Sequence, residues 1–138
     1  MVDEERQEFL LGSARTGSLA TVRPDGRPHV APIWFDLDGD AVIFTTWHTS
    51  VKARNIMNEP RVSLCVDDEE PPFAFVLIEG EATLTAEDPD LRYWATRIAG
   101  RYMGNELAES YGERNSVGGE LLGRISPKNI VAQKNIAA

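Results

Sequence analysis

Short runs of β-branched and aromatic residues recur along the chain and predict β-strands. The clearest run is residues 41–47, AVIFTTW, which suits a pleated sheet. Comparable runs lie at residues 18–23, 27–37, 61–67, 73–85, 120–125 and 129–133. Turn sequences at residues 24–26 (PDG) and 38–39 (DG) separate the first runs. The pattern therefore predicts six or seven strands, joined at the start by hairpins.

Prolines and a glycine modify two of these strands. Pro28 and Pro32 lack the N–H that a central ladder needs, so the strand over residues 27–37 is predicted to be bulged or at a sheet edge. Such a strand leaves backbone groups that a ligand can bind. Gly80 interrupts the long strand and predicts a bulge or bend.

Three segments have helical character besides the one that follows residue 50. Residues 3–14 read as a short amphipathic helix with acidic residues in its first turn. A second helix begins at Asp88 and Pro89, and a short helical piece is predicted over residues 106–111. The second helix carries an apolar stripe at helical spacing, formed by Leu91, Trp94, Ile98 and Tyr102.

Short strands with few helices predict a mainly β, α+β fold. We expect a closed or partly closed antiparallel barrel, because the hairpins are short-range; an α+β sandwich is the alternative. The length of 138 residues fits a single domain over residues 1–138.

A strand-to-helix junction at residues 46–54 is the strongest candidate site. Ser50 and its neighbour Thr49 are N-cap residue types, and a helix is predicted from Val51 until Asn58 and Pro60 end it. A helix N-terminus offers free N–H groups and a positive dipole. Hydroxyls and cations gather at this junction, namely Thr46, Thr49, Ser50, Lys52 and Arg54. The junction therefore suits an anion such as phosphate; a capped surface helix with solvated cations is the alternative.

Charge and composition exclude several function classes. The formal net charge of −8 disfavours non-specific nucleic-acid binding, and 42% hydrophobic residues are ordinary for a globular protein. The acidic N-terminus is unlike a secretory signal and no apolar run is long enough to span a membrane, so we expect a cytoplasmic protein.

Few residues offer metal or nucleophile chemistry. His29 and His48 are too few for a three-histidine metal site, so no metal is expected. Cys65 lies in an apolar run and is expected to be inert. No G-x-S-x-G, G-x-G-x-x-G or P-loop motif occurs. Trp34, Trp47 and Trp94 are either core residues or stacking platforms.

The string SLATVRPDGRPHVAPIWFDLDGDAVIFTTWHTSVKARNIMNEPRVSL carries a family resemblance. It resembles the core of the split β-barrel flavin-binding proteins, the pyridoxamine 5′-phosphate oxidase-like superfamily. More narrowly, it is similar to the flavin/deazaflavin oxidoreductases, in the branch that uses the deazaflavin coenzyme F420. The matching pieces are LAT…DGRPH, T-S-x-K-x-R-N, N-x-P-R-V and IEGEATL, and they cover residues 10–86.

The resemblance implies a six-stranded split barrel that forms a homodimer with cofactor sites between the subunits. The residues that fall where the family holds the cofactor phosphate are Thr46, Ser50, Lys52 and Arg54. Those on the strand against the cofactor ring are Ala31, Pro32, Ile33 and Trp34. Val51 stands where many FMN-binding oxidases carry an arginine, which tilts the expectation from an oxidase toward the reductase branch.

The implied activity is an F420-dependent oxidoreductase that transfers a hydride from reduced deazaflavin to a small unsaturated organic substrate. The alternatives are an FMN-binding oxidoreductase of the same fold, or a non-catalytic carrier or sensor for flavin, F420 or haem. No catalytic acid is assigned. Tyr102, Tyr111 and His48 are candidates only, and a structural role is favoured for each of them.

Overall fold

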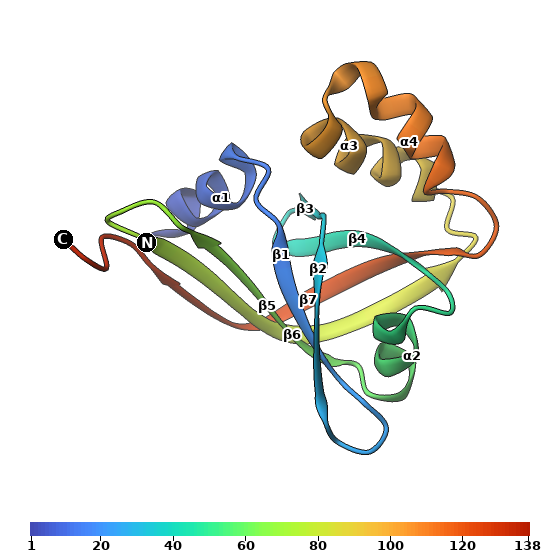
Figure 1. Cartoon of the computed structure of the whole chain (residues 1–138), viewed down its shortest axis with the longest axis horizontal. Coiled ribbons are helices and arrows are strands. Elements are labelled where there is room, and N and C mark those ends of the chain that lie inside the picture. Colours follow the sequence, from blue (N-terminus) through green and yellow to red (C-terminus); the bar gives the residue numbers. More distant parts are fainter.

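The computed structural model describes residues 1–138, and most predicted elements are present in it (Figure 1). The elements along the chain are α1 (Asp3–Gly12), β1 (Gly17–Val22), β2 (Pro28–Ile33), β3 (Asp36–Asp38), β4 (Ala41–Trp47), α2 (Val51–Asn58), β5 (Arg61–Asp68), β6 (Ala74–Ala86), α3 (Leu91–Met103), the 3-10 turn η1 (Asn105–Leu107), α4 (Ala108–Arg114) and β7 (Glu120–Gln133). No helix among them is long and apolar enough to cross a membrane.

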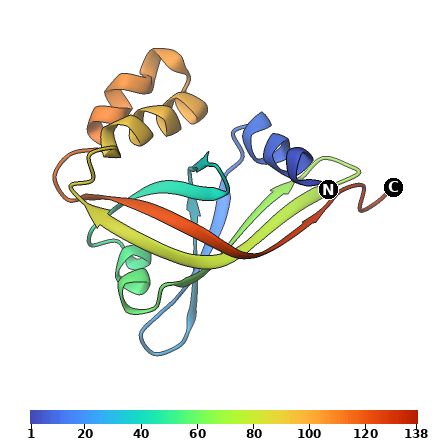
Figure 2. The same ribbon diagram turned by 180° about the vertical axis from the view of Figure 1, so that it is seen from behind.

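All the strands belong to one antiparallel sheet of seven, in the spatial order β2-β1-β5-β6-β7-β4-β3. β2 and β3 are at opposite edges, although only residues 34–35 separate them in the chain. Three Cα–Cα steps span at most about 11 Å, so the sheet must coil until its two edges approach each other. Figures 1 and 2 show the long strands curving accordingly.

The prediction of a six-stranded barrel is wrong in strand number and in closure. No ladder joins β2 to β3, so the coiled sheet remains open. The extra strand arises because the run over residues 27–37 divides at Trp34 and Phe35. Its last two residues, Asp36 and Leu37, then pair with β4 instead of β1, together with Asp38.

The two short strands predicted on either side of residues 126–127 are one continuous strand, β7. Pro127 lies opposite Gly80, where the β6–β7 register shifts. The shift confirms the bulge predicted at Gly80 and allows a proline within the strand. A Cβ atom on Gly80 would lie 2.2 Å from the carbonyl oxygen of Ser126, so only glycine fits this close approach.

The prediction that β2 is an edge strand is confirmed. β2 pairs only with β1, where Pro28 lies opposite Val22 and Pro32 opposite Ser18. The outer edge of β2 has no strand beside it. This is the position at which a missing proline N–H costs no ladder hydrogen bond.

The core lies inside the coiled sheet, with a second cluster under α3. Residues that are fully buried there include Leu19, Phe35, Val42, Phe44, Leu64, Val66, Val76 and Ile125. The apolar stripe predicted for α3 is confirmed: Leu91, Trp94 and Ile98 pack with Ile43 and Leu122, and Tyr102 borders this cluster. α3 and α4 pack together on one side of the sheet (Figure 1).

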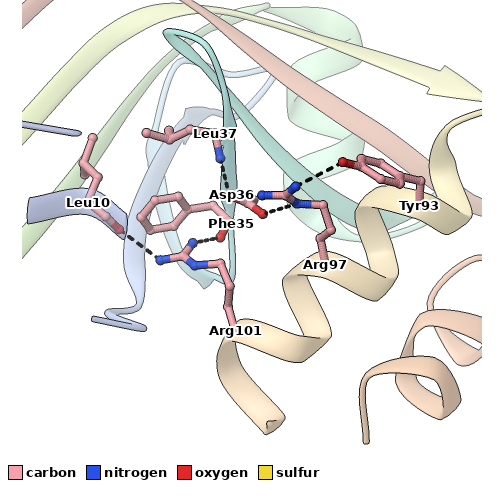
Figure 3. Close-up of polar contacts among 7 residues, drawn as sticks. All are labelled: Leu10, Phe35, Asp36, Leu37, Tyr93, Arg97 and Arg101. Carbon is pink, nitrogen blue, oxygen red and sulfur yellow. Dashed lines mark hydrogen bonds and ion pairs between the residues drawn. The ribbon is translucent and has the colours of Figure 1, made fainter. Parts of the chain in front are cut away.

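A buried carboxylate ties α3 to β3. The Asp36 side chain is 2% exposed; it accepts a hydrogen bond from the Leu37 N–H at 2.8 Å and one from Arg97 Nε at 3.1 Å. Arg97 also donates to the Tyr93 hydroxyl at 3.0 Å (Figure 3). The carboxylate therefore replaces lost hydration with two donors, as a buried charge requires.

A second arginine of α3, Arg101, donates hydrogen bonds to two backbone carbonyl groups that are far apart in the chain. Arg101 donates to the carbonyl oxygen of Phe35 and, at 3.0 Å, to that of Leu10 at the end of α1 (Figure 3). Its guanidinium also lies 5.1 Å from the centroid of the Phe35 ring. One side chain thus joins α3, α1 and the connection between β2 and β3.

The N-terminus of α2 is capped as the sequence predicts. Ser50 Oγ accepts a hydrogen bond from the Ala53 N–H at 3.2 Å and lies 2.7 Å from Thr46 Oγ1, with which it shares a second hydrogen bond. The helix ends at Asn58, before Glu59 and Pro60. Local sequence therefore defines this element at both ends.

We expect Ser50→Ala to lower the free energy of unfolding by about 1–2 kcal/mol, because the cap and the bond to Thr46 are both lost. Urea denaturation measures the change. Thr49→Ala is the control: Thr49 is exposed and makes no side-chain hydrogen bond, so a change below about 0.5 kcal/mol is expected. Equal effects of the two variants would contradict the capping role.

Asp36→Ala should destabilise the fold by about 1–3 kcal/mol, since Arg97 and the Leu37 N–H both lose their acceptor. Asp38→Ala is the matched control, because Asp38 is 48% exposed and pairs with Arg124 at 2.9 Å. An exposed pair of this kind contributes at most about 1 kcal/mol. Thermal and urea unfolding compare the variants, and a larger loss for Asp38→Ala would contradict this account.

Candidate functional site

A hollow of about 320 Å³ lies where α2, β4, α3 and the start of β7 meet the end of β2. Five of the residues proposed from the sequence line it, namely Pro32, Ile33, Trp34, Thr46 and Lys52. The structure therefore gathers the two halves of the predicted site, the edge strand and the strand-to-helix junction, around one space.

The other three predicted residues do not line this hollow. Ser50 is one hydrogen bond away, since its hydroxyl is bound to that of Thr46. Ala31 is half-buried on β2, opposite Leu19 of β1. Arg54 is exposed on α2 and forms no ion pair.

Lys52 is the only cation that lines the hollow, and no carboxylate forms an ion pair with it. The side chain is partly buried, and burial lowers the pKa of its ammonium group. The negative charge of Glu120 acts in the opposite direction and raises that pKa. A charged group that is partly dehydrated and unpaired gains most when an anion binds beside it.

Glu120 faces the same hollow from the first position of β7. Burial raises the pKa of its carboxyl group, while the positive charges of Lys52 and Arg114 lower it. Glu120 lies opposite Trp47 in the β4–β7 pair. No sequence pattern identifies Glu120 as a site residue, because only the long-range pairing of β4 with β7 brings it to Lys52.

Two indole rings form part of the wall. Trp34 is 37% exposed and Trp47 43% exposed, whereas Trp94 is buried under α3. Trp94 is therefore a core residue, whereas Trp34 and Trp47 have exposed rings against which a ligand can pack. Planar aromatic groups gain stability when they pack against such rings.

Trp34 is held in place by a parallel stack on Tyr102. The ring centroids lie 5.0 Å apart and the ring planes differ by 3°. The Tyr102 hydroxyl donates to the carbonyl oxygen of Arg15 at 2.7 Å and accepts from the Phe35 N–H at 3.3 Å. Both hydrogen bonds restrain the tyrosine, so it supports the indole from behind.

The three candidate proton donors named from the sequence lie in different surroundings, and none of them lines the hollow. The hydroxyl of Tyr102 is engaged in the two bonds above, and burial raises its pKa. His48 is exposed, with its ring 4.8 Å from that of Trp47, and does not line the hollow. Tyr111 is on α4, under the guanidinium of Arg114.

A larger hollow of about 650 Å³ lies elsewhere, over β1, β5 and the bulge of β6. Its charged side chains already have partners: Lys128 lies 3.7 Å from Glu81, and Arg61 pairs with Glu59. Volume alone would therefore make the larger hollow the ligand site, whereas the presence of unpaired charged side chains points to the smaller hollow. We assign the site to the smaller one, because its charged groups remain available to a ligand.

The side chains that could bind a metal ion are dispersed, and the single thiol is partly buried. No three His, Cys, Asp or Glu side chains lie close enough together to hold a metal ion. Cys65 is partly buried on β5, where burial and the charge of Asp67 raise the pKa of its thiol. A raised pKa reduces the thiolate fraction, and with it the reactivity.

Solved structures share the fold of this chain. The conserved hypothetical protein Rv2991 from Mycobacterium tuberculosis aligns with a TM-score of 0.84 and 28% identity, over 98% of this chain and 86% of that one. A protein described as an F420 reductase aligns with a TM-score of 0.70 and 28% identity, over 90% of this chain and 94% of that one.

A putative pyridoxamine 5′-phosphate oxidase from Listeria innocua shows the same fold at 20% identity. Its TM-score is 0.75, and the alignment covers 96% of this chain and 98% of that one. The sequence profile of the pyridoxamine 5′-phosphate oxidase family matches residues 2–131. Since the match spans nearly the whole chain, this protein belongs to the pyridoxamine 5′-phosphate oxidase family.

Proposed function

We propose that this protein is an F420-dependent oxidoreductase that reduces a small unsaturated organic molecule, with the cofactor bound in the hollow beside Lys52. One observation carries the proposal: an unpaired, partly buried ammonium group shares a hollow with two exposed indoles. A ligand that combines an anionic group with a planar ring matches both features. The 28% identity to a protein described as an F420 reductase supports the same choice.

Each half of the hollow has its own task in this proposal. Lys52 and the neighbouring hydroxyl of Thr46 bind the phosphate, and Ser50 orients that hydroxyl through the 2.7 Å hydrogen bond. Arg54 is exposed on α2 and does not line the hollow, so Lys52 is the cation to which the proposal assigns the phosphate. The unpaired outer edge of β2, over residues 31–33, offers backbone groups to the ring.

The bound deazaflavin supplies the hydride chemistry. The protein positions the reacting molecules and keeps water away from them. Ala95 and Ile98 of α3 give the hollow an apolar side, and Trp34 is fixed there by Tyr102. No side chain of the hollow is assigned as a catalytic acid.

FMN is the second candidate cofactor, because it combines the same two chemical features. Only one cation lines the hollow, and Val51 precedes it where a second cation would strengthen binding of a doubly charged phosphate. This difference favours F420. A carrier or sensor role would leave the same binding site without turnover.

A homodimer with shared sites completes the proposal. β2 has an open edge and carries Val30, which is 63% exposed, next to the exposed Pro32 and Trp34. Open strand edges and exposed apolar groups are typical of interfaces. A second copy that covers β2 would bury these groups and enclose the hollow.

Side-by-side titrations of the apoprotein with F420 and FMN test the cofactor. We expect F420 to bind more tightly, and Lys52→Ala to weaken its binding by about 1.5–3 kcal/mol, since a charge-assisted hydrogen bond is lost. Lys128→Ala, at the larger hollow, should leave the affinity unchanged. Loss of affinity in Lys128→Ala alone would move the site to that hollow, and tighter FMN binding would make FMN the cofactor.

Sedimentation should show a particle of twice the 15.3 kDa of the chain. Val30→Asp should shift it toward the monomer and weaken cofactor binding in parallel, because a charge would be buried in the interface. Val2→Asp is the control, since Val2 is also 63% exposed but lies before α1. A monomer that binds the cofactor with full affinity would contradict the shared site.

A further inference from the structure

Lys52 and Glu120 approach the hollow from different elements and remain unpaired. Neither side chain forms a hydrogen bond or an ion pair, although both are partly buried and each feels the charge of the other. They are the only charged residues that line the hollow. The lining therefore carries one positive and one negative charge, instead of the net positive charge expected of a site for a highly charged anion.

The position of Glu120 is fixed by its neighbours. Its N–H donates to the carbonyl oxygen of Val117 at 3.0 Å. The following residue, Leu121, is paired with Thr46 in the β4–β7 ladder. The preceding Gly119 has a φ of +100°, and a Cβ atom there would lie 2.5 Å from the Trp47 ring. This tight packing places the carboxylate beside the hollow on a rigid part of the backbone.

We propose that Glu120 is a specificity residue that limits the anionic group held by Lys52 to a single negative charge. The site then prefers a phosphodiester to a phosphate monoester. The inference rests on the proposed function, because it assumes that the ligand places its phosphate beside Lys52. The role of Glu120 would explain why the site accepts one phosphate-bearing cofactor in preference to another.

The selection follows from charge alone. A phosphate monoester such as FMN carries close to two negative charges at pH 8, because its second pKa is about 6. A phosphodiester, the form of the phosphate in F420, keeps one. Each additional negative charge near Glu120 is repelled. At a separation of about 6 Å and an effective dielectric constant of about 40–80, as in a hollow open to solvent, the repulsion amounts to roughly a three- to tenfold loss of affinity.

The test compares FMN with riboflavin, which has the same ring and no phosphate, in the full-length protein at pH 8. Glu120→Gln keeps the shape of the side chain and removes its charge. We expect the variant to bind FMN about three- to tenfold more tightly and riboflavin with unchanged affinity, as measured by quenching of flavin fluorescence. FMN affinity alone decides the test if riboflavin binds too weakly to titrate.

Glu79→Gln is the matched control, since it removes one negative charge from the exposed side chain of Glu79, which lines the larger hollow. It should change neither affinity. FMN binding that stays the same or weakens in Glu120→Gln overturns the inference, as does an equal gain for riboflavin or in the control.

Failure of this inference is distinct from failure of the proposed function. If the wild-type protein binds F420 while Glu120→Gln leaves FMN binding unchanged, only the role of Glu120 is lost. If neither form binds F420, FMN or riboflavin, both the site and the role of Glu120 are overturned.

Discussion

The connection between β2 and β3 is the constraint on which the rest of the structure depends. Two residues, Trp34 and Phe35, carry the chain from one edge of a seven-stranded sheet to the other. So short a segment forces the sheet to coil around its core. Phe35 is fully buried, and its backbone is held by Arg101 and Tyr102, so α3 is fixed to the same point. Trp34 then faces the hollow, next to Pro32 and Ile33 at the end of β2.

The fold treats buried charged groups differently in two places beside α3. Near the connection, Asp36 is buried with Arg97 and the Leu37 N–H as donors, so its charge is compensated. In the hollow, Lys52 and Glu120 are partly buried without a partner. Partial dehydration of unpaired charges costs stability, and proteins retain such arrangements mainly at functional sites. This contrast identifies the hollow more clearly than its volume does.

The hollow is built from segments that are far apart in the chain. β2 contributes an open backbone edge, the β4–α2 junction a cation and hydroxyls, α3 an apolar side, and β7 a carboxylate. Family membership accounts for the shared fold and for the general type of ligand. The choice among ligands depends on individual side chains, and the balance between Lys52 and Glu120 is the feature of this chain that bears on it most directly.

The sequence by itself determined what depends on neighbouring residues. The Ser50 cap, the end of α2, the edge position of β2 and the bulge at Gly80 all follow from local backbone chemistry, and the family resemblance followed from the motifs of residues 10–86. Only the tertiary structure decided strand number, sheet closure and the place of Glu120. The pattern of polar and apolar residues along the chain cannot show that one β-rich run divides between two sheet edges. Nor can it show which distant strands pair. Those outcomes depend on long-range packing, which no local pattern contains.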